Sequence, residues 1–211
     1  MKNLKKSYKK YKHFYFVKSV FKDTNKNNFD KIKFTKESLY SVSKVNGAKF
    51  LYKMIKKIFK TTLTLILTDA TANIGSDSIF LSDYFKSINS IELKKENYEA
   101  LTNNVKVLKK KNINVYNEDS NILLPSLKQD IIYVDAPWGG PDYKLKKKVE
   151  LYLGEKEIMQ FYFDNKKLAK LFIFKVPNNY KLSNIKKVTS NNYKIYSYEK
   201  KYLLIFIRNI L

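Results

Sequence analysis

From residue 63 onward the sequence alternates short apolar runs with segments whose apolar residues recur at three- and four-residue intervals, and no other feature constrains the fold more. The runs are typical of buried strands, and the intervening segments of helices. Strands that alternate with helices form right-handed βαβ units, so we expect an α/β fold with a doubly wound, mostly parallel sheet. The expected strands are 63–68, 88–93, 113–116, 131–134, 171–174, 193–198 and 202–207, and the expected helices lie within 69–85, 94–110 and 155–170.

The end of the chain departs from this parallel pattern. Residues 199–201 alone separate the last two runs, which is too short for a parallel crossover. We therefore expect an antiparallel hairpin at the end of the sheet. Upstream, apolar residues between 34 and 59 recur at helical spacing and predict a short N-terminal helical extension. We divide the chain into a basic arm with this extension, residues 1–60, and a sheet domain, residues 61–211.

Charge and composition narrow the class of protein. The 211 residues include 42 Lys and Arg against 19 Asp and Glu, and the net charge of +23 favours a polyanionic partner, nucleic acid above all. With no Cys and one His, we expect neither a metal nor histidine-based catalysis. No apolar run approaches about 18 residues and no signal-peptide pattern opens the chain, so we expect a soluble, intracellular protein without membrane contact.

The first 22 residues contain eight Lys and no acidic residue. Aromatic residues are interleaved with these lysines, namely Tyr8, Tyr11, Phe14, Tyr15 and Phe16. Positive charge combined with stacking surfaces favours contact with RNA, but a solvated basic tail explains the same composition. Both interpretations remain open from the sequence.

The loop that follows the first expected strand, residues 69–78, lies where a doubly wound fold approaches its ligand. This loop needs residues that tolerate positive φ, which Gly75 does best and Asn73 next best. We assign Asp69, Thr71, Asn73 and Gly75 to a cofactor site. A purely structural turn is the alternative.

Three acidic residues follow three successive strands. Glu92 comes 23 residues after Asp69, near the spacing at which this fold places a carboxylate that accepts from ribose hydroxyls. Asp119 follows the third strand, where it can accept from an adenine amino group. Together they predict an adenosine pocket, against the alternative of solvated charges. The sequence lacks the Gly-rich phosphate motifs of nucleotide triphosphatases and dinucleotide enzymes, which favours S-adenosyl-L-methionine as the cofactor.

Residues 135–143, after the fourth strand, hold the only Trp, two of the four Pro and two of the five Gly. Such rigid residues at the active edge of the sheet predict a shaped pocket. A conjugated amino group is a weak nucleophile, so an enzyme must chiefly position it. Asp135 or a backbone carbonyl can accept its N–H, and Trp138 can stack on its ring. The alternative is a Trp packed under a Pro-rich turn.

This nonapeptide, Asp-Ala-Pro-Trp-Gly-Gly-Pro-Asp-Tyr, resembles the Ser-Pro-Pro-Trp-Gly-Gly-Pro-Asp-Tyr signature of the trimethylguanosine synthases. The loop 69–78 is similar to the family's Asp-Ala-Phe-Cys-Gly-Val-Gly-Gly-Asn-Thr, and Glu92 and Asp119 fall on family Asp residues. The resemblance implies a class I methyltransferase that transfers methyl from S-adenosyl-L-methionine to the exocyclic N2 of the 7-methylguanosine RNA cap, giving a di- or trimethylguanosine cap.

The resemblance also implies roles for individual residues and a partner. The implied cofactor-binding residues are Asp69, Thr71, Asn73, Gly75, Glu92 and Asp119. The implied catalytic residues are Asp135, Pro137 and Trp138, and the implied substrate-binding residues are Lys33, Trp138 and Tyr143. The partner is 7-methylguanosine-capped RNA, and we expect a monomer.

Several positions depart from the family pattern. Asn73 and Ser76 replace glycines, and Ala136 replaces the first Pro. Asp135 replaces Ser, which adds a negative charge beside a cationic base. Asn178 replaces an Arg expected near phosphate, so that Lys175, Lys181 or the Lys144 to Lys148 cluster would have to supply that charge. The alternatives are another RNA guanine-N2 or adenine-N6 methyltransferase and a cap-binding module with a decayed cofactor site.

The basic composition makes a first prediction. If lysines contact RNA beyond the cap, binding to a long capped RNA will weaken with salt far more steeply than binding to a cap dinucleotide, because each phosphate contact adds to the log–log slope. Fluorescence titrations between about 50 and 200 mM salt measure both slopes. Equal slopes would mean that the charge is solvated background and that the first 22 residues can be deleted without effect.

Overall fold

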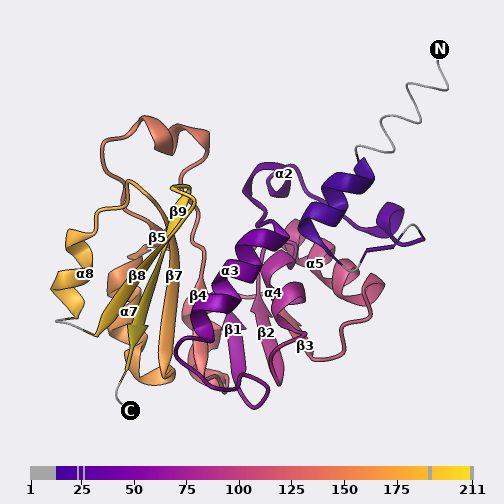
Figure 1. Ribbon diagram of the computed structural model, residues 1–211. Helices are drawn as coiled ribbons and strands as arrows, with labels where there is room; N and C mark the ends of the chain where they lie inside the picture. The colour runs from indigo at the N-terminus through magenta and orange to yellow at the C-terminus, as the bar shows by residue number, and fades with distance from the viewer. Residues whose placement is uncertain (1–12, 23, 26, 190–191, 210–211) are drawn as a thin grey trace.

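A seven-stranded sheet forms the centre of the computed structural model, which describes residues 13–22, 24–25, 27–189 and 192–209 (Figure 1). The strand order is β3-β2-β1-β4-β7-β9-β8. The strands are β1 (Ile66–Asp69), β2 (Ser87–Ile91), β3 (Ile113–Tyr116), β4 (Ile131–Val134), β7 (Leu171–Pro177), β8 (Tyr193–Tyr198) and β9 (Tyr202–Arg208).

The direction of the strands confirms the predicted sheet. The strands β3, β2, β1, β4 and β7 are mutually parallel where they pair. The hairpin of β8 and β9 is antiparallel, and β9 joins the sheet antiparallel to β7. The chain therefore folds as a doubly wound α/β sheet that ends in an antiparallel hairpin.

Helices and short turns of helix connect these strands. The α-helices are α2 (Ser38–Ser41), α3 (Val45–Ile55), α4 (Ser76–Leu81), α5 (Lys95–Val107), α6 (Ser120–Leu123), α7 (Ile158–Asn165) and α8 (Ser183–Val188), and residues 13–20 are also helical. The 3₁₀ helices are η1 (Phe29–Lys31), η2 (Leu124–Ser126), η3 (Pro141–Leu145) and η4 (Lys166–Leu168). Among the described residues, none of the helices has the length and hydropathy of a membrane span.

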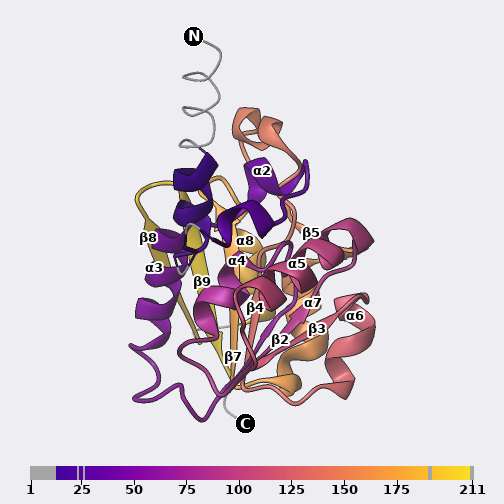
Figure 2. The ribbon, with the colours of Figure 1, turned by 90° about the vertical axis from the view of Figure 1, so that its right-hand side faces the viewer.

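Both faces of the sheet are buried, which explains why the strands are apolar without interruption. In β4, Ile131 and Tyr133 point into the core shared with α3, α4 and α5, whereas Ile132 and Val134 point into the core shared with α7 and α8. Figure 2 shows α3 and α4 on one side of the strands and α7 on the other. Side chains alternate in direction along a strand, so a strand covered on both faces needs an apolar residue at every position.

The N-terminal segment packs against the sheet domain where the structure describes it. Val17 in the helical residues 13–20 is buried, and Phe14 and Phe16 meet Phe29 and Phe34 at ring-centre distances of 5.2 Å each. These two aromatic residues of the basic arm are therefore half-buried against the protein, whereas Tyr15 is exposed. Tyr8 and Tyr11 lie outside the described residues.

The helical pattern of residues 34–59 is divided into two helices. Thr35 and Ser38 exchange hydrogen bonds between backbone N–H and hydroxyl groups at 2.8 and 3.1 Å, and α2 starts there. Lys44 is extended, with ψ of 156°, and α3 begins after it. The intervening residues leave the helix because the side chains of Ser41 and Ser43 bind groups of the sheet domain, as described below. Tertiary contacts thus override helical periodicity here.

Two predicted element boundaries were wrong. The first strand begins at Ile66 and not at 63, because Leu65 N–H donates to the carbonyl of Thr62 at 3.0 Å and closes a turn. The helix expected over 155–170 is α7, which is shorter, and a two-stranded hairpin of β5 (Tyr152–Leu153) and β6 (Lys156–Glu157) precedes it. The side chain of Glu157 accepts from Met159 N–H at 2.8 Å and caps α7.

Gly75 is required by packing as well as by its backbone. Its φ of +89° lies in the left-handed region and begins α4. A Cβ atom at this position would lie 2.4 Å from Leu101 Cδ1 and 3.2 Å from Ile79 Cδ1. The close approach of α4 to α5 therefore leaves no room for a side chain.

We predict that Gly75→Ala lowers the free energy of unfolding by about 2–4 kcal/mol, from left-handed strain together with overpacking. Gly139→Ala is the matched control, because Gly139 has a φ of +86° but no atom within 4 Å of the added Cβ. This control should lose only the strain contribution of about 1–2 kcal/mol. Urea unfolding measures both values, and equal losses would contradict the packing argument.

Candidate active site

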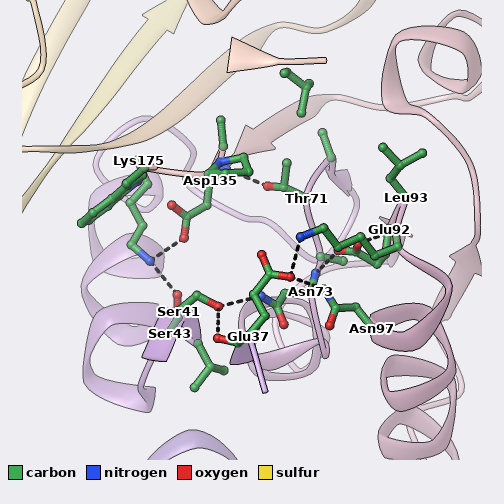
Figure 3. Close-up of a pocket in the computed structure, with 18 of the residues that line it drawn as sticks. Glu37, Ser41, Ser43, Thr71, Asn73, Glu92, Leu93, Asn97, Asp135 and Lys175 are labelled. Carbon is green, nitrogen blue, oxygen red and sulfur yellow. Dashed lines mark hydrogen bonds and ion pairs between the residues drawn. The ribbon is translucent and has the colours of Figure 1, made fainter. Parts of the chain in front are cut away.

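The carboxyl ends of β1, β2 and β4 open into a cavity of about 470 Å³, which residues of the N-terminal segment also line (Figure 3). Such an edge is where a doubly wound sheet places its ligand. Nine of the residues predicted from the sequence line this cavity: Asp69, Thr71, Asn73, Glu92, Asp119, Asp135, Pro137, Trp138 and Tyr143. The structure thus brings together residues that span 75 positions of the chain.

Two predicted site residues do not line the cavity. Gly75 lies behind it, packed against α5. Lys33 is exposed, and its backbone N–H and carbonyl are held by the side chain of Asn104 at 2.8 and 3.0 Å. The predicted contact of Lys33 with phosphate stays a prediction that the cavity does not support.

Asp69 at the end of β1 is buried in the floor of the cavity. Its Oδ2 accepts from Ser78 Oγ at 2.7 Å, and its Oδ1 accepts from Thr71 N–H at 3.3 Å. Burial raises the pKa of the Asp69 carboxyl to about 7, and the nearby carboxylate of Asp77 adds to the increase. This side chain mainly holds the loop, because both oxygens are occupied by groups of the loop and of α4.

Glu92 closes the loop from the other side. Its Oε2 accepts from Asn73 N–H and its Oε1 from Lys94 N–H, both at 2.8 Å. Asn73 has a φ of +50°, as its place in the loop predicted. Burial raises the pKa of Glu92, while these backbone hydrogen bonds oppose the increase. The carboxylate is thereby fixed in one orientation along the cavity wall.

Asp119 caps α6, and its Oδ1 accepts from the backbone N–H and from Nδ2 of Asn121 at 2.8 and 2.9 Å. The same Nδ2 donates to the carbonyl of Leu153 at 3.2 Å, which ties the β5–β6 hairpin to this end of the cavity. Tyr152, Leu153 and Gly154 of the hairpin line the cavity. The sequence reasoning missed these three residues because it assigned no element to residues 152–154 and placed the second strand of the hairpin in the helix expected over 155–170.

An ion pair occupies the end of β4. Lys175 Nζ donates to Asp135 Oδ2 and to Ser43 Oγ, each at 2.7 Å, and Asp135 N–H donates to Thr71 Oγ1 at 2.8 Å (Figure 3). The suggestion that Lys175 meets phosphate is therefore wrong, since its ammonium group is buried and paired. A signal was present in the sequence, because a lysine inside the apolar run 171–177 must bury its charge and needs an anion.

Trp138 lies next to this pair. Its ring meets Tyr143 edge to face with 5.1 Å between ring centres, and Lys175 Nζ lies 5.9 Å from the Trp138 ring centre. The indole N–H is buried, and its interaction with the Asp135 carboxylate opposes the rise in the pKa of that carboxyl that burial causes. Trp138 and Asp135 therefore interact at this end of the cavity.

The N-terminal segment is attached by polar contacts to the loop after β1 and to the residue that precedes α5. Asn73 Nδ2 donates to Ser41 Oγ at 3.0 Å, and Lys94 Nζ pairs with Glu37 Oε2 at 2.7 Å. Together with Ser43 on Lys175, these contacts place residues 40–43 in the cavity wall. Asn73, which departs from the glycine of the family pattern, thus uses its side chain to hold this segment.

The strand order, the terminal hairpin and the acidic residues at successive strand ends define a class I methyltransferase. The chain belongs to the RNA cap guanine-N2 methyltransferase family, whose family model matches residues 63–208. The methyl donor that this family assignment gives is S-adenosylmethionine.

The chain is also similar to a viral protein and to solved structures. An uncharacterized protein of Acanthamoeba polyphaga mimivirus is 36% identical over 121 residues, which are 55% of this chain and 47% of the viral protein. This chain therefore spans about half the length of that relative. The T. thermophilus 16S rRNA N2 methyltransferase RsmC, solved with S-adenosylmethionine and guanosine, has a TM-score of 0.64 at 13% identity, covering 81% of this chain and 45% of RsmC.

A precorrin-6y C5,15-methyltransferase from Geobacter metallireducens matches with a TM-score of 0.61 at 12% identity, covering 85% of this chain and 95% of its own. RsmC and this enzyme are named for different substrates. At such low identity these likenesses show the fold alone.

The cavity geometry generates a prediction for Glu92. If its carboxylate accepts from the ribose, Glu92→Gln will weaken S-adenosylmethionine binding by about 10- to 100-fold, because a hydrogen bond to a charged group contributes roughly 1.5–3 kcal/mol. Glu99→Gln is the matched control, since Glu99 is exposed on α5 and does not line the cavity. Isothermal titration measures both affinities. Unchanged binding by the Glu92 variant would refute the assignment of this wall to the cofactor.

Proposed function

We propose that this protein transfers methyl from S-adenosylmethionine to the exocyclic N2 of the 7-methylguanosine cap of RNA. One observation carries the proposal: Trp138 and Tyr143, which belong to the seven consecutive residues, 137–143, shared with the trimethylguanosine synthase signature, line the same cavity as Glu92 and Asp119. The family assignment over residues 63–208 supports it. An acceptor base at Trp138 would share one enclosed space with the donor.

The residues present fit S-adenosylmethionine. Neither the amino-acid tail nor the adenosine of this cofactor contains a phosphate group. The cavity accordingly offers carboxylate groups and apolar side chains instead of a phosphate cradle. Glu92 would hold the ribose, and Asp119 the adenine amino group beside Leu93 and Leu153. Bound there, the cofactor supplies an electrophilic methyl group on a sulfonium.

The chain's own part in catalysis is to position a weak nucleophile. Trp138 would stack on the base and fix its plane. Asp135 would accept an N–H of the exocyclic amine with its carboxylate, whose Oδ2 is held by Lys175. This contact would orient the nitrogen lone pair. Pro137 would hold the turn that places both side chains.

The cap phosphates and the RNA would leave the cavity past η3. Tyr143 and Lys144 line this exit, and Lys146 to Lys148 follow in the chain. These lysines are better placed than Lys181, which pairs with Glu150 at 3.0 Å. Residues 1–60 would contribute to substrate binding through residues 40–43 of the cavity wall.

The substrate test compares two cap analogues that differ only at N7. We expect methyl transfer to N2 of the 7-methylguanosine analogue and almost none to the unmethylated one, because a cationic ring gains roughly 0.5–2 kcal/mol of cation–π attraction on Trp138. Mass spectrometry of the product nucleoside reads both the rate and the methylated position.

Variants of Trp138 separate stacking from cofactor binding. Trp138→Ala should abolish turnover without changing S-adenosylmethionine affinity, and Trp138→Phe should keep part of the turnover through its smaller ring. Comparable rates on both analogues would replace the cap-specific proposal with a general guanine-N2 methyltransferase. A methyl group found on N6 of adenine would reject both of these guanine-N2 functions. Binding of the cap without the cofactor, and without any turnover, would indicate a binding module.

A further inference from the structure

Lys175 is the only buried lysine in the part of the chain that the structure describes. Its Nζ contacts Asp135 Oδ2 and Ser43 Oγ at 2.7 Å and lies 5.9 Å from the Trp138 ring centre. It therefore borders both groups that are proposed to hold the acceptor base.

The surroundings of this pair are otherwise acidic. Burial acts to lower the pKa of Lys175, but attraction to Asp135 and Asp77 outweighs burial and raises that pKa, so the ammonium keeps its charge. Burial raises the pKa of Asp135, and Lys175 opposes the increase. Among the described residues, the other ionisable groups that face the pair are Asp69 of β1, Asp77 of α4, Tyr133 of β4 and Tyr202 of β9.

We propose that Lys175 is a positioning and specificity-determining residue: it holds the Asp135 carboxylate beside Trp138 and cancels the charge of that carboxylate. Selection of a cationic base then depends on the Trp138 ring and not on a net negative site. The inference rests on the proposed cap substrate and names the residue that sets its electrostatics.

Removing the charge of Lys175 and removing the charge of Asp135 should change the affinity for a cationic base in opposite directions. With an effective dielectric constant of about 20, one unit charge roughly 7 Å from a cationic base changes its affinity by about 50-fold before screening by salt. Removing the ammonium leaves an uncompensated carboxylate, which favours the cation. Removing the carboxylate charge leaves an uncompensated ammonium, which disfavours it. Removing both restores the neutral balance.

The experiment uses Trp138 fluorescence, because Trp138 is the only Trp in the chain and its quenching reports stacking without turnover. The probes are two cap dinucleotides with adenosine as the second nucleoside, differing only by the N7 methyl group. Both are titrated into the full chain at a pH at which 7-methylguanine remains a cation. The measured quantity is the ratio of their affinities.

We expect Lys175→Met to raise this ratio by about 5- to 30-fold, Asp135→Asn to lower it by a similar factor, and the double variant to return within about threefold of the original protein. Lys181→Met is the control, because Lys181 pairs with Glu150 away from the cavity, and its ratio should not change. Affinity for S-adenosylmethionine, measured by calorimetry, should stay within about threefold in every variant.

A pH series distinguishes this electrostatic role from a structural one. Without Lys175, the pKa of Asp135 rises further, so the enhanced preference of Lys175→Met should disappear as the pH falls and Asp135 takes up a proton. The double variant should show no such change. A packing defect would lower both affinities together without this pH dependence.

Single variants that shift the ratio in the same direction, or not at all, would overturn the inference while the proposed function stands. If thermal melting shows that Lys175→Met does not fold, Asp135→Asn and the double variant still decide, since the first must lower the ratio and the second must restore it. Failure of the unmodified protein to bind either dinucleotide would overturn the proposed function and this inference together.

Discussion

The clustering of three carboxylates and one ammonium at the carboxyl edge of the sheet is the constraint on which the site depends. Asp69, Asp77 and Asp135 lie close together because parallel strands and the helix after β1 converge there, and Lys175 is the cation that faces them. In the folded protein the Asp69 carboxyl has a pKa of about 7, against an ordinary 3.8, so the folded protein binds a proton there more tightly than the unfolded chain does. The burial of Asp69 therefore lowers the free energy of unfolding increasingly as the pH rises between those two values.

The same charges connect the N-terminal segment to the sheet. Ser43 shares Lys175 with Asp135, and Ser41 accepts from Asn73, so residues 41–43 contact both the end of β4 and the loop after β1. These contacts replace the helical turn that the sequence pattern favours between α2 and α3. Residues 40–43 thereby form a wall shared by the proposed cofactor and substrate ends of the cavity.

Much of this arrangement was predictable, for identifiable reasons. Strands buried on both faces leave uninterrupted apolar runs, and a three-residue connection between β8 and β9 permits only a hairpin, so the sheet and its antiparallel end followed from local pattern. Residues such as Glu92 and Asp135 come directly after strands, so the convergence of strand ends placed them together. The β5–β6 hairpin escaped because two-residue strands carry no periodicity.

By itself, the sequence determined the doubly wound sheet, its terminal hairpin and the gathering of acidic residues at one edge, because strand pattern and connection length are local properties. Only the tertiary structure decided that Lys175 pairs with Asp135, that Lys33 stays outside the cavity and that Ser41 and Ser43 enter its wall. The physical reason is that a buried charge must find its counter-ion through space, and residues 40 and 132 positions away supply the partners of Lys175.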